Sequence, residues 1–188
     1  MKVFILSLGV IVVTMPSLFT CRTASPEPHT TDRLKADNWR VYIAPDRSFS
    51  VELPCAVVQR NVSATSSPIY EYGCGVEDDS GLRFFSVGVL NMTDAESARM
   101  RDESNFERSI KDSFPPNRKP AKLMTLKIED GIGREVVVTN TRDEMDNLRA
   151  RVIIFGSRRY EVGFDASDIK ALESPMAERF FSSFKPLK

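Results

Sequence analysis

Three cysteines are the residues whose type and position say most about chemistry in this chain. Cys21 follows an apolar run at residues 3–19, an arrangement that is typical of an exported protein. Cys55 and Cys74 then form an even pair, which suits an oxidising compartment. Their spacing is not Cys-x-x-Cys, so a structural disulfide is favoured over a reactive thiol pair. The cysteines therefore predict a location and a crosslink.

The segment in front of Cys21 predicts how the chain is exported. Its apolar part is too short to span a bilayer and has the length of a signal-peptide core. The tetrapeptide Leu-Phe-Thr-Cys that ends at Cys21 resembles the lipobox of bacterial lipoproteins, in which the cysteine receives diacylglycerol. We predict a signal peptide at residues 1–20, lipidation of Cys21 and attachment to the membrane through that lipid. Secretion without a lipid, or a retained N-terminal anchor, are the alternatives.

Carboxylates are the other candidate chemical groups. They gather at residues 77–79 and 143–146, where they could bind calcium or act as an acid–base pair. Neither group has the spacing of an EF-hand loop, and each lies where the tip of a hairpin is expected. We therefore expect solvated turns, with no metal and no cofactor.

The single histidine, His29, lies outside the expected folded domain. It belongs to the polar stretch 21–37, which we interpret as a flexible tether. The folded part would then lack an imidazole for Ser-His or Cys-His catalysis and for most zinc sites. This absence favours a protein that is not an enzyme.

Length and charge predict one domain with no attraction to phosphate backbones. The chain has 188 residues, with 26 Lys and Arg against 26 Asp and Glu. After the signal peptide and tether, residues 38–188 have the size of a single domain. A neutral chain has no electrostatic reason to bind nucleic acid.

The domain that must position these groups has the pattern of short strands. Phe49, Val51 and Leu53 alternate with polar residues, as in a half-buried strand, and an Asp-Gly pair at 130–131 indicates a hairpin. The strands are expected at residues 39–44, 49–53, 69–74, 82–90, 123–128, 136–138, 150–155 and 159–164.

Two helices are expected to cover this sheet. Thr93 and Glu96 have the spacing of a capping box, which predicts a helix from there to Ser113. Ser174 followed by Pro175 marks the start of a second helix. Their apolar stripes are Phe106, Ile110 and Phe114 in the first helix, and Met176, Phe180 and Phe184 in the second. The order of elements predicts an α+β fold with a mainly antiparallel sheet covered by helices.

Four segments of this pattern recur together in one family: Trp39, the sequence Phe-Ser-Val-Glu-Leu-Pro at 49–54, Gly-Ser-Arg-Arg-Tyr at 156–160 and Arg-Phe-Phe-Ser-Ser-Phe at 179–184. In these segments the chain resembles the PsbP-like superfamily. That superfamily includes the extrinsic PsbP subunit of photosystem II and many bacterial lipoproteins. The resemblance implies an α/β/α sandwich over most of residues 38–188. It also implies a role in assembly or interaction rather than in catalysis.

These observations together predict an extracytoplasmic, lipid-anchored domain that binds a ligand or assembles with an envelope protein. We expect it in the cell envelope, in the periplasm or at the outer membrane, or secreted if it carries no lipid. A carboxylate-dependent extracytoplasmic hydrolase is the alternative. It would require acidic residues with raised pKa values in a cleft.

Overall fold

The computed structural model describes residues 32–33, 38–61, 69–78, 81–113, 122–139 and 147–187. The predicted signal peptide, Cys21, His29, the acidic residues of 143–146 and Phe114 lie outside the described residues, as does the expected tether except for residues 32–33. Within the described ranges, the helices are too short or too polar to cross a membrane.

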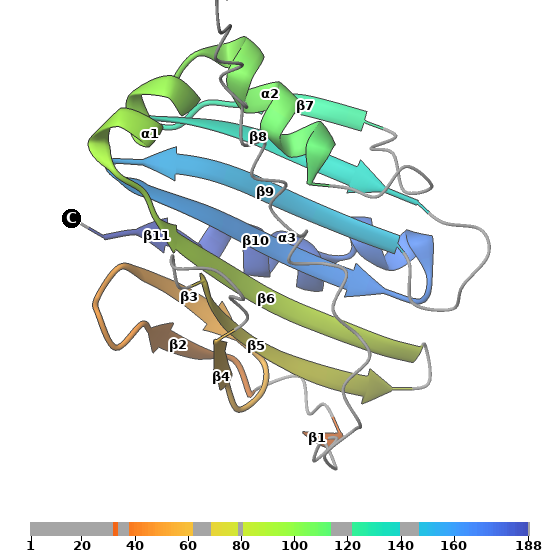
Figure 1. The fold of residues 1–188 in the computed structure, drawn as a ribbon. Coiled ribbons are helices and arrows are strands. Elements are labelled where there is room, and N and C mark those ends of the chain that lie inside the picture. The colour runs from red at the N-terminus through yellow and green to blue at the C-terminus, as the bar shows by residue number, and fades with distance from the viewer. Residues whose placement is uncertain are drawn as a thin grey trace, which may run out of the picture.

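A large sheet forms the middle of the molecule (Figure 1). Its strands pair antiparallel, apart from β1, which runs parallel to β5. In spatial order they are β1 (Asp32–Arg33), β5 (Ile69–Asp78), β6 (Gly81–Asn91), β10 (Arg158–Ala166), β9 (Asn147–Phe155), β8 (Gly131–Val138) and β7 (Lys122–Leu126), with β4 (Val58–Asn61) also paired to β5. The predicted α+β class with a mainly antiparallel sheet is confirmed.

A second, smaller sheet packs against the large one. It consists of β2 (Arg40–Ile43), the central strand β3 (Phe49–Leu53) and β11 (Lys185–Pro186). Phe49, Val51 and Leu53 are buried and join the core of the large sheet, as their alternation predicts. The small sheet thus brings the start of the domain together with its last strand.

The helical segment after Thr93 forms two helices rather than the single one expected. These are α1 (Asp94–Met100) and α2 (Glu103–Asp112). Thr93 and Glu96 do make the predicted capping box. The break follows from Asp102, which has an extended backbone and accepts a hydrogen bond from the Asn105 amide at 3.0 Å, so that it caps a new helix.

The last helical segment begins where Ser174 and Pro175 predict. A 3-10 helix, η1 (Ile169–Glu173), leads into α3 (Pro175–Ser183). The Ser174 side chain accepts a hydrogen bond from the amide of Ala177. Figure 1 shows α3 behind the large sheet, on the face opposite to α1 and α2.

The two faces of the large sheet carry separate cores. Beneath α2 the buried residues are Phe106, Ile110, Val136, Val138, Leu148, Ala150, Val152 and Ile154. On the α3 side the core includes Cys74, Phe85, Val87, Tyr160, Val162, Phe164, Phe180 and Phe181. Because both faces are covered, Glu161 is also buried although it alternates with apolar residues along β10.

One strand is longer than its sequence pattern indicates. We expected a strand that ends at Cys74 and an acidic turn at 77–81, but β5 continues to Asp78. The reason is that Val76 and Cys74 both point into the core, and β6 pairs with β5 as far as Asp78 and Gly81. Of the acidic residues at 77–79, two therefore belong to a strand.

The hairpin of β9 and β10 turns where expected, at Gly156 and Ser157. Gly156 has φ of 60°, in the left-handed region that glycine adopts without strain. This hairpin places Tyr160 on the core face, where its hydroxyl donates to the carbonyl oxygen of Ser48 at 2.9 Å.

Candidate binding groove

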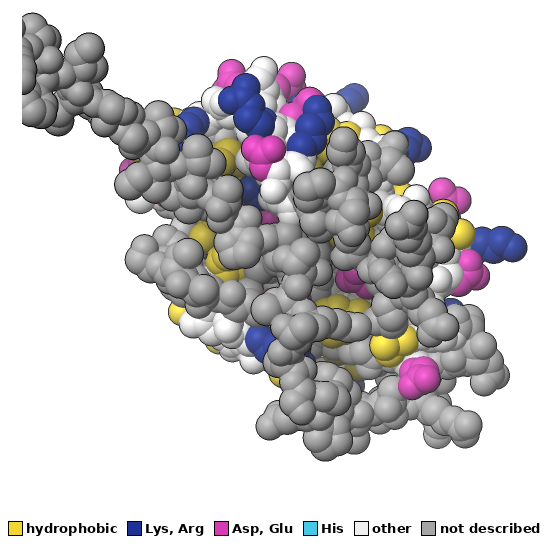
Figure 2. All heavy atoms as spheres, turned by 45° about the vertical axis from the view of Figure 1, so that its right-hand side comes forward, with side chains coloured by type: hydrophobic (Ala, Val, Ile, Leu, Met, Phe, Trp, Pro, Cys, Tyr) yellow, Lys and Arg dark blue, Asp and Glu magenta, His cyan; other side chains and the backbone are white. Residues whose placement is uncertain are grey.

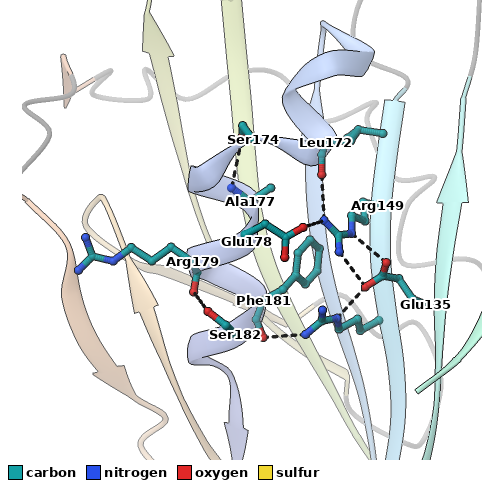
Figure 3. A network of polar contacts seen from close by, with 10 residues as sticks. Glu135, Arg149, Leu172, Ser174, Ala177, Glu178, Arg179, Phe181 and Ser182 are labelled. Atoms are coloured by element: carbon teal, nitrogen blue, oxygen red, sulfur yellow. Dashed lines mark hydrogen bonds and ion pairs between the residues drawn. The ribbon is translucent and has the colours of Figure 1, made fainter. Parts of the chain in front are cut away.

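Helix α3 presents polar side chains on two flanks. Figure 3 shows Glu178 and Phe181 turned toward Arg149 and Glu135, whereas Arg179 points to the opposite side. There Arg179 meets Glu52 of the small sheet. The first flank is buried against the large sheet, and the second is open to solvent.

On the buried flank, one carboxylate holds two arginines. The Nε atom of Arg149 lies 3.0 Å from Glu135, and the Nε atom of Arg151 lies 2.8 Å from it. The Glu135 side chain is 6% exposed. Arg149 also pairs with Glu178, so two positive and two negative groups balance at this place.

The same arginines hold the last helical segment onto the sheet (Figure 3). Arg149 donates to the carbonyl oxygen of Leu172 at 3.1 Å, and Arg151 donates to that of Phe181 at 2.9 Å. Their guanidinium carbons lie 4.8 and 4.9 Å from the centre of the Phe181 ring. Such contacts satisfy carbonyl groups near helix ends and add cation–π attraction.

The protonation state of Glu135 indicates what this network can do. Burial raises the pKa of Glu135, but the hydrogen bonds and charges of Arg149 and Arg151 outweigh it and bring the pKa below its ordinary value. A general acid at neutral pH needs a raised pKa instead. The network is therefore an ionised clamp that fixes α3 on β8 and β9.

On the exposed flank lies an open groove of about 420 Å³. It is open to solvent and lined mainly by polar residues, in contrast to the enclosed, mostly apolar pockets that bind small ligands. Its walls come from α3, from the two outer strands of the small sheet and from the central strand between them. The lining residues are Val41, Ser50, Val51, Glu52, Arg179, Ser182, Ser183 and Lys185.

The Arg179 side chain is fixed in place at the edge of the groove. Its Nε atom lies 2.7 Å from a carboxylate oxygen of Glu52, and its guanidinium lies 4.7 Å from the Trp39 ring. The backbone N–H of Glu52 donates to the Ser183 hydroxyl at 2.9 Å, which joins α3 to β3. The groove is therefore preorganised rather than formed by free side chains.

The charged residues that line the groove do not balance one another. Arg179 neutralises Glu52, whereas Lys185 is exposed and makes no ion pair with the part of the chain that the structure describes. The three groups together leave one positive charge beside the Ser50 and Ser182 hydroxyls. This favours an anionic ligand group.

One border of the groove is the free edge of the small sheet. Among the described residues, β2 pairs with β3 alone. The amide of Ala44 donates to Phe49, so the alternation of an antiparallel ladder directs the N–H and C=O groups of Val41 and Ile43 away from β3. Both side chains are exposed, at 66% for Val41 and 55% for Ile43. An open edge with apolar side chains is a surface that can pair with another strand.

The predicted disulfide is present. Cys55 and Cys74 are bonded, with their Cα atoms 5.8 Å apart, and the bond joins the segment just after β3 to the middle of β5. It therefore attaches the small sheet, and the groove on it, to the large sheet. Cys21, the predicted lipidation site, lies outside the described residues.

The acidic residues singled out in the sequence do not form a site in the described part of the chain. No three His, Cys, Asp or Glu residues converge there in a way that could hold a metal ion. Of the first group, Glu77 lies at the exposed end of β5 and pairs in the ladder with Leu82. The second group lies outside the described ranges.

Charges on the α1–α2 surface are mixed. Figure 2 shows basic and acidic side chains next to one another at the top of the molecule, where α1 and α2 lie. Residues 94–113 contain six acidic and four basic residues, so both signs are present with a small acidic excess. The groove differs from this surface because its one extra charge, that of Lys185, is positive and lies in a groove that Val41 also lines.

Sequence reasoning missed the groove. Ser50 and Glu52 were expected to be the solvent side of a strand, and β11 was not predicted. Lys185 lies opposite Ser50 only because this two-residue strand pairs with β3. The one available signal was the pair Val41 and Ile43, apolar residues that alternate with Arg40 and Tyr42. No protein-family model matches the chain, and comparison with curated proteins finds none that is significantly similar in sequence.

Proposed function

We propose that this protein is an extracytoplasmic, lipid-anchored, non-enzymatic domain that binds or assembles with a protein of the cell envelope. The observation that carries the proposal is the preorganised groove beside β2, which pairs with β3 alone among the residues that the structure describes. Exposed apolar side chains next to unpaired strand backbone suit recognition of another chain. The membrane attachment rests on Cys21 and the apolar segment before it.

Two features support the location. The Cys55–Cys74 disulfide suits an oxidising compartment such as the periplasm. The N-terminal sequence has the order of a signal peptide followed by an acylated cysteine. Both point to the same side of the membrane.

The arrangement of the layers supports a PsbP-like α/β/α sandwich as the architecture. Helices α1 and α2 cover one face of an antiparallel sheet, and α3 covers the other (Figure 1). Apart from Trp39, which precedes β2, the segments that carry the resemblance lie in or directly after β3, in the β9–β10 hairpin, and in or directly after α3. They meet in the same core, where Phe49, Tyr160 and Phe180 are all fully buried.

Location is tested by mass analysis of the mature N-terminus after expression with and without globomycin. We expect a diacylglycerol-modified Cys21 in the membrane fraction, and accumulation of the unprocessed chain when the lipoprotein signal peptidase is inhibited. A mature N-terminus beyond Cys21 would disprove the lipid anchor. A full-length, reduced chain in the cytosol would disprove export altogether.

Binding is tested by placing a photo-crosslinking amino acid at position 41 of the full chain in native membranes. The matched control is position 58, because Val58 is also exposed, at 51%, but belongs to β4 of the large sheet and does not line the groove. We expect a discrete envelope protein to crosslink from position 41 and not from position 58, and Ile43→Ser to reduce the yield. Equal labelling from both positions would contradict a docking role for this surface.

A further inference from the structure

We propose that the groove binds an acidic side chain of an extended peptide whose neighbouring apolar side chain packs on Val41 and Ile43. This inference rests on the proposed binding function and names the chemistry of the partner. It follows from how the small sheet arranges its outer face.

The outer face of the small sheet has its residues in rows. Ile43 lies opposite Ser50, and Ser50 lies opposite Lys185, so these three side chains form one row across the strands. Val41 lies opposite Glu52 in the next row. Since adjacent strands are about 4.8 Å apart, the apolar edge and the Lys185 backbone are separated by about 10 Å.

Charge selects an anion for one end of this row. Arg179 is occupied by Glu52 and by the Trp39 ring. Among the described residues that line the groove, Lys185 is therefore the cation left for a ligand, and a single carboxylate would neutralise the groove. The hydroxyl of Ser50, next to Lys185 in the row, can donate a hydrogen bond to the same carboxylate.

An extended peptide supplies both contacts with its natural spacing. Side chains two residues apart lie on the same face of a strand, about 6.8 Å from each other. The lengths of a lysine and a glutamate side chain span the remaining distance to Lys185. The complementary sequence is therefore an apolar residue, any residue and then an acidic residue. Because the groove is open to solvent, the peptide chain can continue past it, and an internal side chain suffices.

Three peptides test this chemistry on the purified, disulfide-bonded domain. They are N-acetyl-Val-Ser-Glu-amide, its isosteric glutamine analogue N-acetyl-Val-Ser-Gln-amide, and the glutamine peptide with a free terminal carboxylate. Amide NMR titration gives affinity and location together. We expect only the glutamate peptide to bind at millimolar concentration, with shifts concentrated at Val41, Ser50, Glu52, Ser182 and Lys185.

The matched variants are Lys185→Gln and Lys170→Gln. Lys170 is an exposed lysine on η1, outside the groove. An exposed ion pair contributes up to about 1 kcal/mol, so Lys185→Gln should weaken the glutamate peptide about fivefold. Lys170→Gln should leave its affinity unchanged.

Each other result overturns the inference. If the glutamine amide binds as well as the glutamate peptide, the charge of the ligand plays no role. If the free-carboxylate peptide binds preferentially, the groove recognises the end of a chain and not an acidic side chain. Shifts elsewhere, equal effects of both lysine variants, or no binding at millimolar concentration also exclude it. These outcomes leave the crosslinking test from position 41 intact, so failure of the peptide chemistry is distinct from failure of the docking function.

Discussion

The two flanks of α3 carry the same kinds of charged residue in different surroundings. On the buried flank, Arg149 and Arg151 are matched by Glu135 and Glu178 and also bind backbone carbonyl groups. On the exposed flank, Arg179 is matched by Glu52, and Lys185 remains without an ion pair among the described residues.

Burial explains the difference. A charge removed from water must be paired and hydrogen-bonded, so the buried flank has no capacity left for a ligand. A charge at the surface can stay solvated until a partner arrives. The comparison separates a structural clamp from the proposed binding surface, and the following changes test that separation.

The largest effect is expected for Glu135→Gln. It leaves Arg149 and Arg151 buried with one carboxylate fewer, which costs about 4 kcal/mol. Urea unfolding measures the loss, and Glu52→Gln is the control, because its exposed pair with Arg179 contributes about 1 kcal/mol or less. Equal losses in the two variants would show that the flanks do not differ in this way.

Removal of the disulfide should destabilise the small sheet and leave the clamp on β8 and β9 intact. Replacing Cys55 and Cys74 together by serine removes a link across 19 residues and should lower the free energy of unfolding by about 3 kcal/mol. Hydrogen exchange should become faster in β2 and β3, whereas β8 and β9 keep their protection. Uniform acceleration across both sheets would contradict this.

Acid should weaken the buried flank. The folded-state pKa of Glu135 lies below its ordinary value, so the folded state binds fewer protons than the unfolded state. The resulting stabilisation is present above the ordinary pKa of 4.5 and is lost as the pH falls through the lower, folded-state pKa. Stability measured from pH 6 downward should therefore decrease more steeply in the natural protein than in Glu135→Gln. Parallel curves would show that this carboxylate does not contribute.

The smallest effects on stability belong to the exposed flank. Arg179→Ala loses the contacts with Glu52 and Trp39 and should cost about 1 kcal/mol. Lys185→Gln should change stability by less than about 0.5 kcal/mol, because Lys185 is a surface residue. A large loss from Lys185→Gln would mean that this lysine supports the fold and is not free for a ligand.

Local patterns predicted most of the architecture. The alternation in β3, the capping box at Thr93 and the Ser-Pro start of α3 depend on neighbours a few residues apart, and all are found as expected. The split between α1 and α2 was missed because Asp102 is acceptable inside a helix by propensity, and only its backbone geometry shows that it caps a new one.

The sequence by itself determined a pair of cysteines for one crosslink and an α+β pattern of strands and helices. Only the tertiary structure decided which charges are buried and which remain exposed. Glu135 and Arg149 are 14 residues apart, and Glu52 and Arg179 are 127 residues apart. Such pairs depend on strand register and on the packing of α3, and these arise from the whole core rather than from any local segment.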